Sequence, residues 1–236
     1  DGEIIKAARI NAKNAAVEIS QRKRILYIGN DFICVEVSKR KPLTNNKGYY
    51  LEQTLKTLPI HKASSSNGLK ISDLAGENGI LAMEGGITGV MNSNIAKYSI
   101  VNEISRQETN FALFRKAGHW FFKGRLNFED NNPLPYIEYN INLILPSDMV
   151  AYDVLQVPWS TIKERLPQTV DAYTSPNEDM AVLLTNDSVY VYKINGATLS
   201  DIPLLKFKIP EGSSVIAVEW GIGSYTEKWQ NSFIKN

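Results

Sequence analysis

The chain has 236 residues, of which 43% are hydrophobic, and its 26 basic residues nearly balance its 25 acidic ones. This composition excludes a disordered protein, and the net charge of +1 leaves no overall field that would draw the molecule to nucleic acid or to a membrane. A charged partner would therefore have to bind a local patch. No apolar run reaches the roughly 18 residues that a membrane-spanning helix needs, so we expect no transmembrane span.

The start of the chain and its cysteine content bear on where the protein works. The sequence opens at Asp1 without an initiator Met, which favours an exported protein whose signal or lipoprotein leader has been removed; the alternative is a segment cut from a longer chain. Cys34 is the single cysteine, which excludes an intramolecular disulfide and points away from a disulfide-stapled module. We therefore expect an extracellular or cell-envelope location in a bacterium.

The N-terminal third of the chain mixes helix and strand signals. Residues 3–19 are rich in Ala and fit either one helix or two strands. Residues 26–37 have Gly-Asn-Asp at their centre, which predicts a β-hairpin. Residues 50–58 carry apolar side chains at helical spacing up to Pro59, which predicts a short helix.

Alternation with a period of two dominates the rest of the chain. From Trp120 to Phe128 every second residue is apolar or Gly, and residues 110–115 supply the partner strand of a hairpin whose turn uses Gly118 at positive φ. Further strand-like runs lie at residues 80–84, 98–104, 137–145, 150–157, 180–185, 189–194, 204–209 and 215–220.

Two more helices are expected in the C-terminal half. Thr161 and Glu164 have the spacing of a capping box, and Pro167 ends the segment that follows. Ser224 and Glu227 repeat this spacing near the end of the chain. The second helix has one apolar stripe, formed by Tyr225, Trp229 and Phe233.

Together these elements predict a mostly β fold, α+β at the margin. We expect antiparallel β meanders and hairpins with about three short helices. The whole chain (1–236) is expected to form one β-rich globular unit. A subdomain boundary, if there is one, falls in the 130–135 loop and separates residues 1–129 from residues 136–236.

A small propeller-like arrangement is the alternative fold. Residues 26–37 and 182–193 each have a strand, an Asn-Asp turn and a strand, as a propeller blade does. The likeness does not repeat at a fixed period along the chain, so antiparallel meanders remain the preferred prediction.

The sequence lacks the strong signatures of catalytic and metal sites. It contains no Walker-type phosphate loop, no His-Glu-x-x-His, no Cys-x-x-Cys and no Gly-x-Ser-x-Gly. With His61, His119 and one Cys, the usual ligand set of a zinc site cannot be assembled. We therefore expect no metal and no cofactor, and an enzyme is the less favoured class of protein.

Two motifs that resemble functional ones have simpler structural interpretations. The Gly-Gly-Ile-Thr-Gly of residues 85–89 would cradle a phosphate only before a helix, and the extended pattern of residues 87–91 predicts a turn or bulge instead. Ser160 and Lys163 have the Ser-x-x-Lys spacing of acyl-transfer enzymes. Ser160 stands where a helix cap is expected, so we assign it to capping.

The alternative function is a small hydrolase that acts on envelope glycans with a carboxylate pair. Such an enzyme needs two carboxylates about 5–10 Å apart in a cleft. The candidate acids are Glu84, beside two glycines, and Glu129, after the Trp120 strand, and His119 is the candidate general base. A chain with 25 acidic residues produces such candidates by chance, so this hypothesis ranks second.

One cluster of basic residues has a favourable geometry. Residues 22–24 and residues 39–41 flank the 26–37 hairpin, and antiparallel pairing places residue 24 opposite residue 36 or 37. Both basic triplets then meet at the open end of the hairpin. The charge distribution agrees, since residues 1–62 contain 12 basic and 6 acidic side chains. The predicted anion-binding residues are Arg22, Lys23, Arg24, Lys39, Arg40 and Lys41.

These observations favour binding over catalysis. We expect a non-catalytic ectodomain of an exported bacterial envelope protein or lipoprotein that binds a ligand or partner. Through the basic hairpin it would contact an anionic envelope polymer such as teichoic acid, or lipid headgroups. Nucleic acid is disfavoured, because Tyr27 and Phe32 lie on strands where the core is expected to enclose them. A protein partner remains open.

Overall fold

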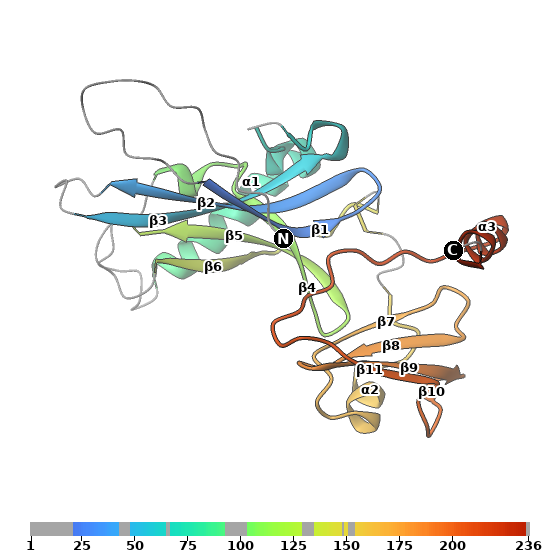
Figure 1. Cartoon of the computed structure of the whole chain (residues 1–236). Helices are drawn as coiled ribbons and strands as arrows, with labels where there is room; N and C mark the ends of the chain where they lie inside the picture. Colours follow the sequence, from blue (N-terminus) through green and yellow to red (C-terminus); the bar gives the residue numbers. More distant parts are fainter. Residues whose placement is uncertain are drawn as a thin grey trace. The chain divides into compact units, whose positions relative to one another are not determined.

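The computed structural model shows a mostly β protein with antiparallel sheets, and the part of the chain that it describes contains three α-helices (Figure 1). The chain divides into two compact units: unit 1 comprises residues 1–114 and 120–151, and unit 2 comprises residues 115–119 and 152–236. The described residues are 21–42, 48–64, 67–92, 103–128, 135–147, 149–150 and 154–234.

The first sheet of unit 1 is a three-stranded antiparallel meander. Its strands are β1 (Gln21–Ile28), β2 (Phe32–Pro42) and β3 (Tyr49–Pro59), in that spatial order. The turn between β1 and β2 is closed by the Gly29 N–H, which donates to the Phe32 carbonyl at 2.8 Å. The central strand β2 is therefore hydrogen-bonded along both edges.

A helix and a second three-stranded meander complete unit 1. The helix is α1 (Ile71–Met91), and the short 3-10 segments η1 (Ile60–Lys62) and η2 (Glu103–Arg106) lie before and after it in the chain. The strands are β4 (Phe111–Lys116), β5 (His119–Asn127) and β6 (Tyr136–Ile141), with β5 in the middle. Helix α1 is interrupted by non-helical backbone at Ala75 and Gly76, and Gly79, Met83 and Ile87 form its buried face.

Two asparagine side chains bind the outer edge of β3. The side-chain oxygen of Asn110 accepts the Leu55 N–H at 2.8 Å. Asn127 accepts the Gln53 N–H at 2.8 Å and donates to the Gln53 carbonyl at 3.1 Å, which reproduces the pattern of a neighbouring strand. Because Asn110 precedes β4 and Asn127 ends β5, these amides join the two sheets of unit 1.

The core of unit 1 is built from both sheets and α1. Phe111 and Phe122 meet edge to face in it, with ring centroids 5.3 Å apart. Tyr27 contributes its ring and donates its hydroxyl to the Met149 carbonyl at 2.8 Å. The other buried apolar members of this core are Cys34, Leu55, Ile71, Met83, Ile87, Ala112, Leu113, Leu126, Tyr139 and Ile141.

Two glycines make room for the ring of Tyr139. A Cβ on Gly124, the cross-strand partner of Tyr139, would lie 2.2 Å from Tyr139 Cζ, and a Cβ on Gly86 of α1 would lie 2.6 Å from Tyr139 Cδ2. The ring is thus held between β5 and the helix. Its burial raises the pKa of the Tyr139 hydroxyl above the ordinary value.

Unit 2 is built on one five-stranded antiparallel sheet. Its strands are β7 (Asp171–Thr174), β8 (Met180–Leu184), β9 (Ser188–Asn195), β10 (Thr198–Leu199) and β11 (Leu205–Lys208). Strand β9 pairs with β8 along one edge and with β10 and β11 along the other. Helix α2 (Trp159–Arg165) packs Ile162 against one face of the sheet, and α3 (Ser224–Ile234) lies near the end of the chain.

The turn between β4 and β5 belongs to unit 2 and is bound to β7. The Gly118 N–H donates to the Asp171 carboxylate at 2.7 Å, and Arg115 donates to the Ala172 carbonyl at 2.6 Å. The guanidinium of Arg115 also stacks on the Tyr173 ring, 4.2 Å from its centroid. Gly118 has φ of 82°, which confirms the positive φ predicted for this turn.

The mostly β, antiparallel fold predicted from the sequence is confirmed. The hairpins predicted around Asn30 and Trp120 are present, as are the strands predicted near residues 137, 180, 189 and 204. The two stretches that suggested a propeller are hairpins in separate units, in sheets of three and five strands. Three α-helices are found among the described residues, although α1, with 21 residues, is not short.

The helix predicted for residues 50–58 is wrong, because this segment is strand β3. Leu55 faces the core of unit 1, whereas Leu58 packs with Val35 and Val37 on the opposite face of the sheet. A strand that buries side chains on both faces loses its simple alternation. The three-residue spacing of Leu55 and Leu58 therefore imitates a helix.

Two further predictions are wrong, because the residues lie inside α1. These are the strand predicted for residues 80–84 and the turn or bulge predicted for residues 85–89. Glycine lowers helix propensity by about 1 kcal/mol per residue, so the glycines hide the helical signal. Close packing accounts for two of these glycines, Gly86 on Tyr139 and Gly79 on Ile71, whereas a Cβ on Gly85 or Gly89 would meet nothing within 4 Å.

Other predictions differ locally from the structure or fall outside the described residues. Helix α2 follows Pro158, so Ser160 lies inside the helix and no side-chain cap bond is formed. The described parts of residues 150–157 and 215–220 are not in strands. Residues 3–19, 98–102 and 129–134, and with them most of the predicted 130–135 boundary loop, lie outside the described part of the chain.

The space for the Tyr139 ring can be tested with an added methyl group. Gly124→Ala should lower the free energy of unfolding by about 1–3 kcal/mol, because the new Cβ overlaps the ring. The measurement is the free energy of unfolding by urea, and an unchanged m-value shows that the substitution altered stability alone. Gly85→Ala, on α1 with nothing within 4 Å of the new Cβ, is the control and should be neutral or stabilise by up to about 1 kcal/mol. Equal effects of the two substitutions would contradict this account.

Candidate anion-binding site

The two basic triplets meet at the open end of the β1–β2 hairpin, as predicted. Arg24 pairs with Glu36, Arg22 with Ser38, and Gln21 with Lys39. The chain of β2 then continues beyond the described start of β1, where Arg40 and Lys41 pair with β3. The register thus places all six predicted residues within one end of the first sheet.

Alternation along the strands sends the two kinds of cation to opposite faces of this sheet. In an antiparallel sheet, directly paired residues point to the same face and successive residues to opposite faces. Lys23 pairs with Val37, and Lys39 and Lys41 follow Val37 at steps of two, so these three lysines share a face. Arg24 shares the other face with Glu36, and Arg22 and Arg40 lie on that side by the same alternation.

The lysine side gains a further cation from β3. Lys56 pairs with Val35 and therefore lies on the same face as Lys23 and Lys39. Burial lowers the pKa of the Lys56 ammonium, and the positive charges of Lys39 and Lys23 lower it further. Glu52, opposite Lys39 in β3, is a nearby acid on this face. We call Lys23, Lys39, Lys41 and Lys56 the lysine face.

A cavity of about 330 Å³ lies beside β3 at the edge of the lysine face. Three ammonium-bearing side chains line it, since Lys70, just before α1, joins Lys39 and Lys56. Its remaining lining is largely made of hydrogen-bonding groups. These residues are Glu52, Thr54, Leu55, Asn67, Gly68, Ile104, Gln107, Thr109 and Asn110. Such a lining suits a small anionic group that accepts hydrogen bonds.

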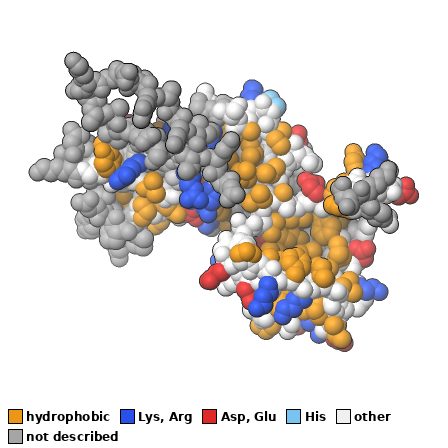
Figure 2. All heavy atoms as spheres, in the orientation of Figure 1, with side chains coloured by type: hydrophobic (Ala, Val, Ile, Leu, Met, Phe, Trp, Pro, Cys, Tyr) orange, Lys and Arg blue, Asp and Glu red, His pale blue; other side chains and the backbone are white. Residues whose placement is uncertain are grey.

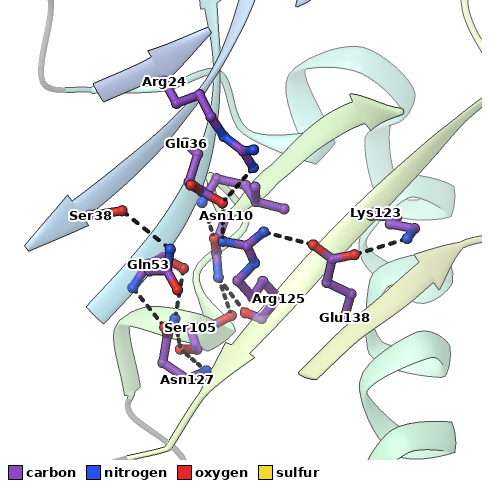
Figure 3. Close-up of polar contacts among 11 residues, drawn as sticks. Arg24, Glu36, Ser38, Gln53, Ser105, Asn110, Lys123, Arg125, Asn127 and Glu138 are labelled. Carbon is purple, nitrogen blue, oxygen red and sulfur yellow. Dashed lines mark hydrogen bonds and ion pairs between the residues drawn. The ribbon is translucent and has the colours of Figure 1, made fainter. Parts of the chain in front are cut away.

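On the arginine side, Arg24 belongs to a network of five charges (Figure 3). Glu36 accepts from Arg24 at 3.2 Å and from Arg125 of β5 at 2.7 Å. Arg125 also bonds Glu138 of β6 at 2.7 Å, and Glu138 bonds Lys123 at 2.9 Å. The network therefore crosses from the first sheet of unit 1 to the second.

Arg125 is the centre of this network and is almost completely buried. Its side chain is 1% exposed, and its guanidinium stacks on the Tyr136 ring, 3.9 Å from the centroid. Burial by itself would raise the pKa of the Glu138 carboxyl, but the hydrogen bonds and positive charges of Lys123 and Arg125 together outweigh it, so this pKa lies below its ordinary value. A carboxylate held in its charged form is a poor general acid. The network links the two sheets of unit 1 by ion pairs, and Arg24 takes part in it through Glu36.

The remaining sequence candidates that the structure describes lie on separate elements of the fold. Glu84 is exposed on α1, His119 is exposed at the start of β5, and Glu129 lies outside the described residues. Lys163 donates to the carbonyls of Pro167 and Thr169 and so closes the end of α2. Within the described residues, no group of His, Cys, Asp or Glu is arranged to hold a metal ion.

The comparisons with known proteins identify no relative. No protein-family model, no curated protein and no solved structure matches the chain. No helix in the described part of the chain is long and apolar enough to cross a membrane.

The sequence analysis missed Lys56 and Lys70 on the lysine side and Arg125 and Glu138 in the charge network. Correct assignment of residues 50–58 to a strand would have placed Lys56 on the same face of the sheet as Lys39, because Lys56 pairs with Val35 and Lys39 pairs with Glu52. Arg125 shares one face of a predicted strand with Lys123, but no local pattern links it to Glu36, 89 residues away.

The network predicts a specific dependence of stability on pH. Because the folded-state pKa of Glu138 lies below its ordinary value of 4.5, its stabilising contribution is complete above about pH 4.5 and is lost as the pH falls through the folded-state value. Wild type should therefore exceed Glu138→Gln in free energy of unfolding near pH 6, and the gap should narrow in acid. The measurement is urea unfolding of both proteins at a series of pH values.

The control for this experiment removes an unrelated charge. Glu77→Gln changes an exposed carboxylate on α1 and corrects for the general effect of one lost negative charge. A gap between wild type and Glu138→Gln that stays constant from pH 6 into acid would contradict the assigned role of Glu138.

Proposed function

We propose that this chain is the non-catalytic, ligand-binding ectodomain of an exported bacterial envelope protein or lipoprotein. Its ligand is an anionic envelope polymer whose repeating groups are phosphates, such as teichoic acid, and the lysine face is the contact surface. The observation that carries this proposal is the convergence of Lys23, Lys39 and Lys56 on one side of the first sheet, next to a cavity that Lys70 also lines.

The chemistry of lysine supports a phosphate-bearing ligand. An ammonium group is a compact charge on a flexible stem, with three donors that adapt to phosphate oxygens. Lys39, Lys56 and Lys70 surround a cavity with room for one anionic group, and Lys23 and Lys41 extend the same charge along the strands. A polymer with regularly spaced phosphates would therefore meet several cations at once.

The electrostatics of the lysine face favour an anion there. The neighbouring charges of Lys39 and Lys23 disfavour the protonated form of Lys56. A bound phosphate would relieve this repulsion by placing negative charge among the three ammonium groups. Arg24 contributes less to an external ligand, because Glu36 already binds its guanidinium.

The alternative of a glycan hydrolase receives less support from the geometry. Two carboxylates, Glu36 and Glu138, do approach each other through Arg125, but each is bound by two cations. Neither is arranged as a general acid or as a free base. We therefore retain binding as the proposed function.

The proposal is tested by replacing the lysines that meet at the cavity. A variant with Lys23→Gln, Lys39→Gln and Lys56→Gln should bind teichoic acid about 100-fold more weakly at low salt, because each cation near an anionic surface contributes about 1 kcal/mol. The salt dependence of its binding should also be shallower, since fewer counterions are released. The measurement is titration of labelled polymer at several salt concentrations.

A control of equal charge separates the lysine face from overall charge. Lys62→Gln, Lys116→Gln and Lys193→Gln replace three exposed lysines elsewhere and should retain the wild-type affinity. Vesicles with anionic lipids, run beside the polymer, distinguish headgroup phosphate from polymer phosphate as the source of the ligand. If both triple variants lose affinity equally, or if wild type does not bind, the lysine face is not the contact surface.

A further inference from the structure

The sheet of unit 2 has two apolar faces, of which only one is covered by α2. The covered face buries Ala172, Ala181, Leu183, Tyr192, Ile194 and Leu199. The opposite face consists of the residues that alternate with these. Direct pairing places Val182, Val191 and Leu205 in one row across the sheet, and Leu184, Val189 and Phe207 in the next. We call these six residues the open face.

The open face is most exposed at its edge strand. Leu205 and Phe207 of β11 are 54% and 46% exposed, whereas Leu184 and Val189, deeper in the sheet, are buried. Figure 2 shows a broad apolar patch over the sheet of unit 2. A contiguous apolar surface beside an edge strand is a typical feature of a protein interaction site.

The same unit carries an amphipathic helix, α3, whose apolar stripe is largely exposed. All side chains of α3 from Ser224 to Phe233 are exposed, and its stripe of Tyr225, Trp229 and Phe233 is 59%, 39% and 78% exposed. The ring of Trp229 lies close to Gly221, where an added Cβ would come within 3.0 Å of Trp229 Cε3. A helix of 11 residues is marginal in water by itself, so its stability requires packing of this stripe.

The charges around the two surfaces are complementary. Strand β11 carries Lys206 and Lys208 and no acid. Residues 209–234, which we call the C-terminal arm, carry the acids Glu211, Glu219 and Glu227 against one base, Lys228. Lys206 and Lys208 pair with Tyr190 and Ser188 and so point to the side of the sheet that α2 covers. They lie at the rim of the open face, where the acids of the arm of another molecule would meet them.

We propose that α3 of one molecule packs its aromatic stripe on the open face of a second copy, and that the exchange is reciprocal. The chain then forms a dimer with two identical contacts. The β4–β5 turn already covers the β7 end of the open face through Asp171 and Tyr173, and the proposed contact covers its exposed β11 end together with the stripe of α3. It is independent of the anion-binding function proposed above.

The available area favours reciprocal exchange over pairing of two α3 helices. Aromatic side chains bury roughly 150–250 Å² each, so the exposed part of the stripe offers roughly 250–450 Å². One helix pair would bury less than about 900 Å² in total, near the range of non-specific contacts, which is under about 800 Å². Two stripe-to-sheet contacts would bury roughly 1,000–1,800 Å², the size of a stable dimer interface.

The test measures the oligomeric state by sedimentation equilibrium. Wild type should be a dimer, and either Phe207→Ser on the open face or Trp229→Ser with Phe233→Ser on α3 should raise the dimer dissociation constant at least tenfold. Leu81→Ser with Ile144→Ser replaces exposed apolar residues outside both surfaces and should leave it unchanged. Circular dichroism checks that each variant remains folded.

A mixing experiment identifies which surfaces meet. In a reciprocal exchange, the Phe207 variant still donates an intact α3 and the α3 variant still has an intact open face. Their mixture should therefore form heterodimers with one good contact, more tightly than either variant associates with itself. A monomeric wild type, as expected if α3 instead covers its own sheet or a lipid surface, would overturn the proposal. So would a mixture that associates no better than its components, as expected for pairing of two α3 helices.

Discussion

The buried guanidinium of Arg125 is the constraint on which unit 1 depends. A charge that is 1% exposed is tolerable only when opposite charges surround it, and these come from Glu36 of β2 and Glu138 of β6. The two ion pairs therefore favour the packing of the two sheets that brings both carboxylates to Arg125. The asparagine bonds from Asn110 and Asn127 to β3 join the same two sheets.

This constraint also organises the surface. Because Glu36 turns toward Arg125, the residues that alternate with it turn the other way, and the two basic triplets separate into lysines and arginines. Arg24 is drawn into the network, while Lys23 and Lys39 remain together beside Lys56. The proposed ligand surface thus lies on the face of β2 opposite Glu36, which binds Arg125. A substitution that breaks the network would therefore also disturb the lysine face, because both depend on the register of β2.

Local patterns predicted much of the fold, and distant contacts explain most of what they missed. The 26–37 hairpin and its register follow from alternation and a Gly-Asn-Asp turn, so the meeting of Arg24 with Glu36 was predictable. The helical spacing of Leu55 and Leu58 misled because β3 is buried on both faces, and the glycines of α1 hide a helix that exists through its packing. The ion pair of Arg125 with Glu36, and the presence of Lys70 and Lys56 at one cavity, depend on how separate segments pack. The spacing of apolar residues along a strand or a helix does not encode such packing.

The asparagine bonds along β3 have a consequence for how the protein behaves at high concentration. A strand at the end of a sheet normally offers a row of free amide and carbonyl groups to which another chain can add, and such addition is the first step toward fibrils. Asn127 already binds both the N–H and the carbonyl of Gln53, and Asn110 binds the N–H of Leu55. The amides thus act as a built-in safeguard against aggregation, and they provide it without adding charge beside the lysines.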